Sequence, residues 1–306
     1  MDLPRYAYFH GQIIPYSEAR VGVLTHALNY GTAVFGGLRA YWNAEEEQLY
    51  LFRPLDHFKR FIGSAKLLLM EIDQTPEELT QIAVALLRQE AYRCNVYVRP
   101  LAYKSDEVIG VRLHNLAHEL SIVSIPFELY VTNDTSAHVM FSSWRRVDDN
   151  MIPARGKISG AYANSSFIKT EAIQAGFDEA LVLTQEGHVS EGSAMNIFMV
   201  RDGVVATPPI TENILEGITR KSVMKLLTDE IGIPVVERPI DRTEVYLCDE
   251  FFMTGTAAQV TAVTRVDHRP IGTRVMGPVA AQLRQIFSDI CHGRHPKYHH
   301  WNTPVY

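Results

Sequence analysis

The sequence predicts an α+β fold with two domains. Three observations indicate this fold class: strand-like segments cluster, helical segments follow in separate runs, and a polar, irregular stretch lies near residues 126–137. A regular alternation of strands and helices, which would predict a doubly wound parallel sheet, is not seen. We expect a small N-terminal domain over residues 1–125, an interdomain linker over 126–137 and a large domain over 138–306. A chain of 306 residues is long enough for a substantial buried core.

The predicted elements of the first domain follow from ordinary patterns. Apolar residues on both sides of His10-Gly11 predict two short strands joined by a tight turn. After Pro54, apolar residues recur at three-to-four spacing as far as Leu69, which predicts a helix with one apolar face. Pro76 and the acids after it begin a second helix that runs to about residue 92. Further strands are predicted at 49–52, 96–99 and 120–125.

The second domain is predicted to mix hairpins with three helices. Strands are expected at 137–141 and 251–253, and two hairpins turn at Glu186-Gly187 and Asp202-Gly203. Gly232 ends the second of the three helices, which are predicted at 164–175, 219–230 and 277–290.

Composition excludes several classes of protein. Hydrophobic residues make up 46% of the chain and charged residues 21%, which is typical of a globular protein. No apolar run is long enough to span a bilayer, and the N-terminus does not resemble a signal peptide, so we expect a cytoplasmic protein with no membrane partner. A formal net charge of −6 without a long basic run argues against nucleic acid as a partner.

Cysteine and histidine spacing predicts neither disulfides nor a metal site. Cys94, Cys248 and Cys291 are far apart and odd in number, so we interpret them as isolated thiols. Four histidines lie near the C-terminus, between residues 292 and 300, but their spacing lacks a regular ligand pattern. An ordinary C-terminal tail is the better interpretation, and no metal is expected.

Lys157 is the first candidate for chemistry. It follows Gly156 and precedes Ser159 and Gly160, so small neighbours leave space around its side chain. A catalytic amine needs such space, and burial lowers the pKa of a lysine towards neutrality. The sequence alone leaves a solvated surface lysine as the more common alternative.

Glu191 and Asn196 are the second candidate, because both lie among small residues between two apolar strands. A buried carboxylate needs a cationic partner or several hydrogen-bond donors, and a protonated pyridine nitrogen would serve. An exposed turn that carries Glu191 remains an equal alternative.

Two segments are suited to an anion. Residues 216–220 open a helix, whose first N–H groups attract negative charge, and residues 254–258 follow a strand with small, hydroxyl-bearing side chains. Each segment alone is better explained as a helix cap. Tyr97 and Arg99 share one face of a strand, where the arginine could meet a substrate carboxylate or form a structural ion pair.

Together, six motifs occur in order along nearly the whole chain, from about Tyr8 to Trp301. They are Thr25–Phe35, Tyr97–Pro100, Lys157, Ser190–Gly192 with Asn196, Gly217–Arg220 and Thr254–Ala258. This set strongly resembles the fold-type IV enzymes that use pyridoxal 5'-phosphate (PLP), and the branched-chain amino acid aminotransferases in particular. The resemblance implies two α/β domains joined by the linker, with the active site between them.

The resemblance also implies roles for single residues. Lys157 would bind PLP covalently and move the proton at the substrate Cα. Glu191 would pair with the pyridinium nitrogen, Tyr162 would hydrogen-bond the phenolic oxygen, and Asn196 would support the ring. The phosphate would be held by Arg60, Ile218, Thr219 and Thr256. Only the motif match singles out Arg60, because it lies off the apolar face of its helix.

By the same resemblance, the substrates are branched-chain L-amino acids and keto acids such as 2-oxoglutarate, and the enzyme is a homodimer or a higher homo-oligomer. Tyr30 and Val111 would reach the pocket across a dimer. The remaining pocket residues would be Phe35, Gly37, Tyr97, Arg99, Phe127, Tyr130, Ala257 and Ala258.

Two departures from the family pattern leave alternatives open. Gly36 stands where branched-chain enzymes usually have Glu, and Arg112 with His114 resembles the carboxylate-binding loop of D-amino acid aminotransferases. These departures suggest D-amino acid or (R)-amine transaminase activity, alone or in addition. Incidental charges on a surface loop remain the less favoured explanation of Arg112. An aminodeoxychorismate lyase shares the fold and the lysine, but the strand at 97–100 and the motif at 254–258 count against it.

Overall fold

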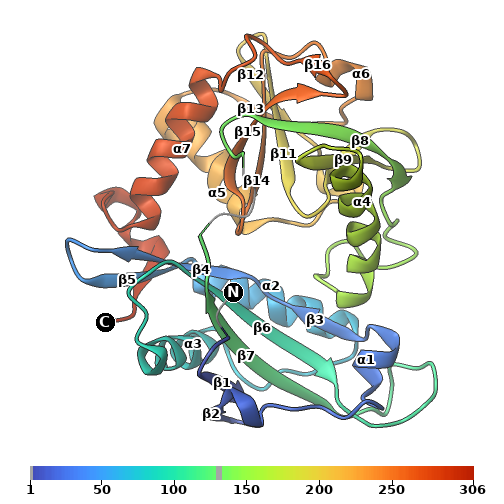
Figure 1. The fold of residues 1–306 in the computed structure, drawn as a ribbon, viewed down its shortest axis with the longest axis vertical. Helices are drawn as coiled ribbons and strands as arrows, with labels where there is room; N and C mark the ends of the chain where they lie inside the picture. Colours follow the sequence, from blue (N-terminus) through green and yellow to red (C-terminus); the bar gives the residue numbers. More distant parts are fainter. Residues whose placement is uncertain (1–2, 129–132) are drawn as a thin grey trace. The chain divides into compact units, whose positions relative to one another are not determined.

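The computed structural model describes residues 3–128 and 133–306, and Figure 1 shows its course. The chain divides into two compact units. Unit 1 comprises residues 1–128, 156–161 and 289–306, and unit 2 comprises 129–155 and 162–288. The division into domains 1–125 and 138–306 stays a prediction. That prediction gave each domain one continuous stretch of sequence. In the structure the chain returns to unit 1 twice, at residues 156–161 and 289–306. Residues 129–132 of the expected linker lie outside the described residues.

Unit 1 is built on a sheet whose described strand pairs are all antiparallel. Among the described residues the strand order is β17-β5-β4-β6-β7-β1-β2, and β3 pairs with β6. The strands are β1 (Tyr6–Phe9), β2 (Gln12–Pro15), β3 (Ala33–Phe35), β4 (Leu38–Asn43), β5 (Gln48–Phe52), β6 (Val96–Lys104), β7 (His118–Pro126) and β17 (Asn302–Pro304). The hairpin predicted at His10-Gly11 is confirmed, since β1 and β2 pair with Phe9 opposite Gln12.

The helices of unit 1 are α1 (His26–Tyr30), α2 (Pro54–Leu67) and α3 (Pro76–Glu90), with 3₁₀ turns at Tyr16–Glu18, Ser159–Ala161 and Pro296–Trp301. Helix α3 packs on β1 and β7, and α2 packs on α3 and β3 (Figure 1). Helix α3 starts where Pro76 predicted, and Thr75 and Glu78 form a capping box there.

The expected end of α2 is wrong by two residues. The helix stops at Leu67, and Leu69, which was predicted on the apolar face, adopts a positive φ of 53° and is 59% exposed. Its N–H still bonds the Lys66 carbonyl, as part of a turn that leaves the helix axis. The apolar spacing continues through this turn by chance, which periodicity alone cannot recognise.

Unit 2 is built on a mixed sheet. Its strand order among the described residues is β10-β9-β8-β15-β14-β11-β12-β13, and β16 pairs with β15. The strands are β8 (Ala137–Arg145), β9 (Glu179–Leu183), β10 (Val189–Gly192), β11 (Asn196–Arg201), β12 (Val204–Thr207), β13 (Val235–Glu237), β14 (Glu250–Gly255), β15 (Gln259–Val266) and β16 (Arg269–Pro270). Both predicted hairpins are confirmed, as β9–β10 and β11–β12.

The helices of unit 2 are α4 (Tyr162–Gln174), α5 (Ile218–Leu226), α6 (Arg242–Val245) and α7 (Pro278–Cys291, whose last turn belongs to unit 1), with a 3₁₀ turn at Ile210–Glu212. Helix α4 packs on β8 and β9, and α5 packs on β14 (Figure 1). The helix predicted at 219–230 is α-helical only to Leu226. It continues as one π turn over Leu227–Ile231 and ends, as predicted, at Gly232, where φ is 74°.

The sheet of unit 2 buries a continuous apolar core that includes Val139, Leu181, Ile197, Phe251 and Met253. This core fixes the ends of the strands that carry the polar residues of the candidate active site. All three cysteines are free; Cys248 and Cys291 are buried and Cys94 is half-buried. No described helix combines the length and the hydropathy that crossing a membrane requires. The described residues also contain no cluster of three or more side chains suited to a metal ion.

Candidate active site

Lys157 lies in a segment that is held tightly within unit 1. Its backbone N–H donates to Ser64 Oγ of α2 at 3.1 Å, and its carbonyl accepts from the N–H of Phe35 at 3.0 Å. Three residues later two glycines complete the attachment, because the Gly160 N–H donates to the Gly31 carbonyl at 3.1 Å. A Cβ at Gly31 would lie 2.8 Å from the Gly160 Cα. The backbone of Lys157 is therefore fixed from both sides, and its side chain is half-buried.

The ring of Phe35 brings two cations together. Lys157 Nζ lies 4.9 Å from the ring centroid, and the Arg99 guanidinium carbon lies 4.6 Å from it. Arg99 also donates to the Tyr97 hydroxyl at 3.2 Å. The sequence placed Tyr97 and Arg99 on one face of a strand, and the structure confirms that they meet. The result is an aromatic wall with two positive charges above it.

Phe127 extends this wall, with its ring centroid 5.5 Å from that of Tyr97. The buried Arg39 holds the backbone here, because it donates to the carbonyls of Phe127 at 2.8 Å and Glu128 at 3.0 Å. The sequence analysis did not single out Arg39. Tyr130, a predicted pocket residue, lies outside the described residues.

Gly36 and Gly37 are both closely covered. A Cβ at Gly37 would lie 2.1 Å from the Tyr97 hydroxyl oxygen, so only glycine fits beside this tyrosine. A Cβ at Gly36 would lie 2.4 Å from Cγ of Pro100. The Glu expected at position 36 from the family pattern therefore could not be accommodated without moving Pro100. Glycine at position 36 therefore fits the close packing against Pro100.

Arg60 and Lys157 both act on the buried His57. Burial holds the pKa of His57 well below its ordinary value, and the charges of Arg60, Arg53 and Lys157 lower it further. The imidazole is consequently neutral, and a region of positive potential surrounds it. Arg60 is half-buried. The structure thus places this predicted phosphate ligand in the electrostatic neighbourhood of Lys157, although helix periodicity gave no reason to notice it.

Tyr30 contacts the loop that contains Val111 and Arg112. Its hydroxyl accepts a hydrogen bond from the Gly110 N–H at 3.1 Å, and the neighbouring His26 Nε2 lies 2.8 Å from the Gly110 carbonyl oxygen. Val111 is 88% exposed, and Arg112 is exposed beside it. Within unit 1, Tyr30, Val111 and Arg112 therefore lie together, because Tyr30 and His26 of α1 hold the loop at Gly110.

In unit 2, Glu191 is the centre of a buried polar cluster and is 3% exposed. One carboxylate oxygen lies 2.7 Å from an Arg146 nitrogen, and the other accepts from Asn196 Nδ2 at 2.9 Å and from the Leu215 N–H at 3.2 Å. The exposed-turn alternative for Glu191 is therefore wrong. Arg146 in turn donates through Nε to the Asn213 carbonyl at 3.2 Å.

Asn196 links this cluster to the start of α5. Its Nδ2 also donates to the Leu215 carbonyl at 2.9 Å, and a Cβ at Gly217 would lie 2.1 Å from its Oδ1. Ile218 and Thr219 begin α5 and are buried. Within the described parts of the chain, no acceptor is found for their backbone N–H groups, as expected at a helix start that could face an anion.

The predicted turn at 254–258 connects β14 and β15, which pair from Phe251–Val263 to Gly255–Gln259. Thr256 and Ala257 are half-buried at its tip and Ala258 is buried. The remaining predicted residue, Tyr162, is half-buried and begins α4, where its carbonyl accepts from Ser166 Oγ at 2.9 Å.

Sequence reasoning missed Arg146, Arg39 and His57. Arg146 directly follows another arginine at the end of β8, and only the fold shows which of the two is buried. Arg39 lies in the segment that departs from the family pattern, and His57 lies on the buried face of α2 beside Phe58. None of the three carries a local signal that distinguishes it from an ordinary surface or core residue.

The chain is similar to known aminotransferases in sequence and in structure. The family Amino-transferase class IV matches residues 33–266. A probable branched-chain-amino-acid aminotransferase of Aquifex aeolicus is 44% identical over 301 residues, which are 98% of this chain and 97% of that protein. A branched-chain aminotransferase of Thermoproteus uzoniensis, solved with norvaline, has a TM-score of 0.94 and 40% identity, and covers 99% of this chain and 100% of that one. The branched-chain amino acid aminotransferase of Thermobaculum terrenum, solved in its PLP form, has a TM-score of 0.94 and 38% identity, with 100% of each chain covered.

Proposed function

The chain belongs to the class IV aminotransferase family, and we propose that it is a PLP-dependent transaminase that moves amino groups between branched-chain L-amino acids and 2-oxoglutarate. The three relatives described above are all named branched-chain aminotransferases. One of the two solved structures contains norvaline, and the other is in the PLP form. The observation within this chain that carries the proposal is the buried Glu191, which is held by Arg146 and Asn196.

The residues present fit the cofactor. A buried carboxylate with fixed donors can accept one more cationic partner, as a protonated ring nitrogen requires. The start of α5 offers two N–H groups that suit a phosphate, and Gly217 before it fits closely against Asn196. Arg60 contributes positive potential in unit 1. We propose that Arg60, Ile218, Thr219 and Thr256 hold the phosphate.

When bound, PLP supplies an electron sink for the negative charge that develops at the substrate Cα. Lys157 would hold the cofactor through Nζ and would move the proton at that carbon, from a backbone that Ser64 and Phe35 fix. Glu191 keeps a proton on the ring nitrogen, and Asn196 orients Glu191. Tyr162 donates to the phenolic oxygen.

The aromatic wall determines which side chains are accepted. Phe35, Tyr97 and Phe127 present apolar ring surface, with Gly37 between them, and this surface suits branched aliphatic side chains. Arg99 binds the distal carboxylate of glutamate, since a guanidinium matches a carboxylate by two parallel hydrogen bonds. Ala257 and Ala258 complete the pocket with small side chains. Tyr130 stays part of this proposal.

The decisive experiment is the isolated first half-reaction. The PLP form, without an acceptor, is mixed separately with L-leucine, D-alanine and (R)-1-phenylethylamine, and the cofactor spectrum is followed. We expect rapid conversion to the pyridoxamine form by L-leucine alone. Comparable conversion by D-alanine or the amine would support the alternative raised by Arg112, and pyruvate release without an acceptor would indicate a lyase. The relatives described above give that alternative no support.

Replacing Gly37 with alanine should lower kcat/KM for L-leucine by about 10- to 100-fold. Moving a side chain of the pocket by about 1 Å can lower the rate by this much. The new methyl group would overlap the Tyr97 hydroxyl and displace the ring from Arg99. Steady-state kinetics measures the effect. Gly63→Ala is the matched control, since it adds the same methyl group to α2 in open space. Equal kinetics in the two variants would contradict the role of Gly37.

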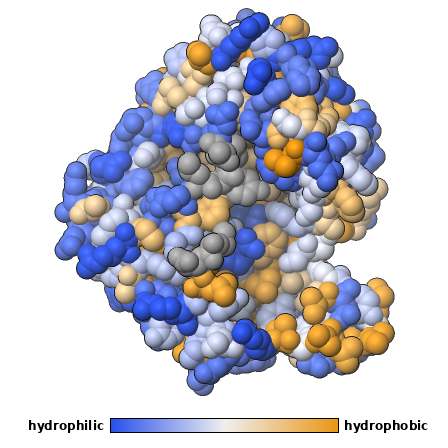
Figure 2. Space-filling model, in the orientation of Figure 1, coloured by the Kyte–Doolittle hydropathy of each residue, from blue (hydrophilic) through white to orange (hydrophobic). Residues whose placement is uncertain are grey.

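We also propose that the enzyme is a homo-oligomer. Hydrophobic residues gather over the α1 side of unit 1, at the lower right of Figure 2. The exposed apolar side chains of α1 and the neighbouring loops are Val21, Val23, Leu24, Leu28, Ile109 and Val111. Large exposed apolar patches mark association surfaces, and we propose that a second copy covers this one and receives Tyr30 and Val111. Sedimentation of the holoenzyme as a monomer would contradict this.

The three free cysteines would stay reduced in the cytoplasm, where we propose that the enzyme works.

A further inference from the structure

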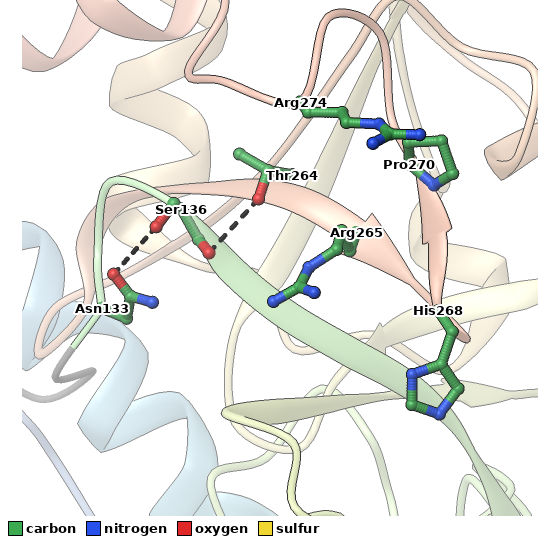
Figure 3. A pocket seen from close by; sticks show the side chains of 7 residues that line it. All are labelled: Asn133, Ser136, Thr264, Arg265, His268, Pro270 and Arg274. Carbon is green, nitrogen blue, oxygen red and sulfur yellow. Dashed lines mark hydrogen bonds between the residues drawn. The ribbon is translucent and has the colours of Figure 1, made fainter.

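Unit 2 carries a surface pocket to which none of the roles above applies. Its volume is about 430 Å³, within the range that proteins offer to small organic ligands. The lining side chains, drawn in Figure 3, are Asn133, Ser136, Thr264, Arg265, His268, Pro270 and Arg274. They come from the residues before β8, from β15, and from β16 with the turns on either side of it. Because β15 pairs with both β8 and β16, the sheet fixes most of the lining.

The lining is cationic. Arg265 and Arg274 are both exposed, and among the described residues neither guanidinium has an ion-pair partner. In contrast, most arginines of unit 2 pair with a carboxylate, for example Arg220 with Glu237 at 2.7 Å. No lining residue is acidic. Two uncompensated positive charges in a chain of net charge −6 form a local site for an anion.

The nearest acids do not neutralise these charges, because they have other partners. Asp134 lies 2.6 Å from an Arg284 nitrogen. Asp267, in the turn between β15 and β16, lies 2.8 Å from Arg242 and accepts the hydroxyl of Tyr246 at 2.6 Å.

The uncharged polar groups of the pocket bond to one another and leave the Asn133 amide nitrogen as a donor. Thr264 Oγ1 donates to the Ser136 carbonyl at 3.3 Å, and Ser136 Oγ donates to Asn133 Oδ1 at 2.9 Å. Figure 3 shows both bonds on one side of the pocket. Since the Asn133 oxygen accepts from Ser136, its amide nitrogen is left to donate to a ligand.

His138, behind the pocket on β8, reports the same positive potential. Its ring lies 5.0 Å from that of His268, and its Nε2 is buried without a hydrogen-bond partner in the described parts of the chain. Burial lowers the pKa of His138 most, and the charges of Arg265 and His268 lower it further, while Asp178 and Asp267 raise it.

We propose that this pocket binds a phosphate group, carried either by inorganic phosphate or by a small phosphate monoester. A phosphate presents three or more terminal oxygens, which can accept hydrogen bonds from more than one of these lining donors at once. A carboxylate has only two oxygens and can serve one arginine fork well. The pocket volume leaves room for the organic part of a monoester.

The test is isothermal titration of the holoenzyme, in which the phosphate subsite of the cofactor is already filled. Inorganic phosphate and glycerol 3-phosphate are the probes, and acetate is the anion control. We expect saturable binding of one phosphate per chain and no measurable binding of acetate. Tighter binding of glycerol 3-phosphate would identify a monoester as the ligand, and equal or weaker binding would identify phosphate itself. In the Arg265→Gln/Arg274→Gln variant we expect affinity to fall at least about tenfold, as loss of charged hydrogen bonds predicts.

Arg269→Gln is the matched control. It removes one positive charge from the neighbouring β16, but Arg269 stacks on the ring of Tyr246 and does not line the pocket. Wild-type affinity in this control with weakened binding in the double variant would support the proposal. Unchanged binding in the double variant, equal weakening in the control, or no binding to wild type would overturn it. The outcome is independent of the transaminase proposal, because binding is measured without a substrate.

Discussion

Replacing Lys157 with alanine is expected to lower kcat for transamination by at least about 10³-fold, because loss of a covalent catalytic group typically costs this much or more. The fold should survive, since the Lys157 backbone is held by Ser64 and Phe35, and these hydrogen bonds remain in the variant. Activity is measured with L-leucine and 2-oxoglutarate. Borohydride reduction followed by peptide mass spectrometry should place the cofactor on Lys157 in the wild type and nowhere in the variant.

Lys59→Ala is the matched control, because it removes an exposed lysine from α2 of the same unit. It should keep wild-type kinetics and cofactor attachment. A Lys157→Ala variant that retains a tenth of the activity, or that is still labelled on another lysine, would refute the assignment. A variant that loses activity together with its thermal transition would report misfolding, and Lys157→Arg would then separate the two effects.

Local features of the fold could be predicted from the sequence because their causes are neighbours in the chain. Helix α3 begins at Pro76 because Thr75 and Glu78 cap it, and β11 and β12 turn at Asp202-Gly203, where both residues have positive φ. The strand β17 could not be predicted. It exists because Asn302 pairs with Phe52, and a register across such a separation has no local signature.

The residues of the candidate site also differ in whether a local motif could identify them. Motifs identified Lys157, Glu191 and Asn196, because each lies in a recognisable run of small residues. The sequence did not identify Arg146 as the partner of Glu191. Arg146 comes from another strand of the sheet, and its burial depends on the packing of the whole unit. Arg60 needed the family resemblance, since its position on α2 is that of a solvated cation.

Replacing Glu191 with glutamine should lower kcat by about 10²- to 10³-fold, the usual cost of losing one preorganised electrostatic partner. It should also destabilise the fold, because Glu191 accepts from three donors, which are Arg146, Asn196 Nδ2 and the Leu215 N–H. A glutamine amide can accept on one side only, so it must direct its own donors at one of these groups. Breaking a buried ion pair typically costs about 3–5 kcal/mol of unfolding free energy. Steady-state kinetics and chemical denaturation measure the two effects.

The two effects can be separated with two further variants. Glu179 is fully buried and lies 2.8 Å from Lys169, so Glu179→Gln breaks a buried ion pair elsewhere in unit 2 and should lose stability without losing kcat of the folded enzyme. Glu191→Gln/Arg146→Met removes the unpaired charge as well, and should regain part of the stability of the single variant. Activity should not return with it, because Glu191 acts on the cofactor and not only on Arg146. If kcat recovers with stability in the double variant, Glu191 has a structural role alone, and the ring nitrogen must find its partner elsewhere.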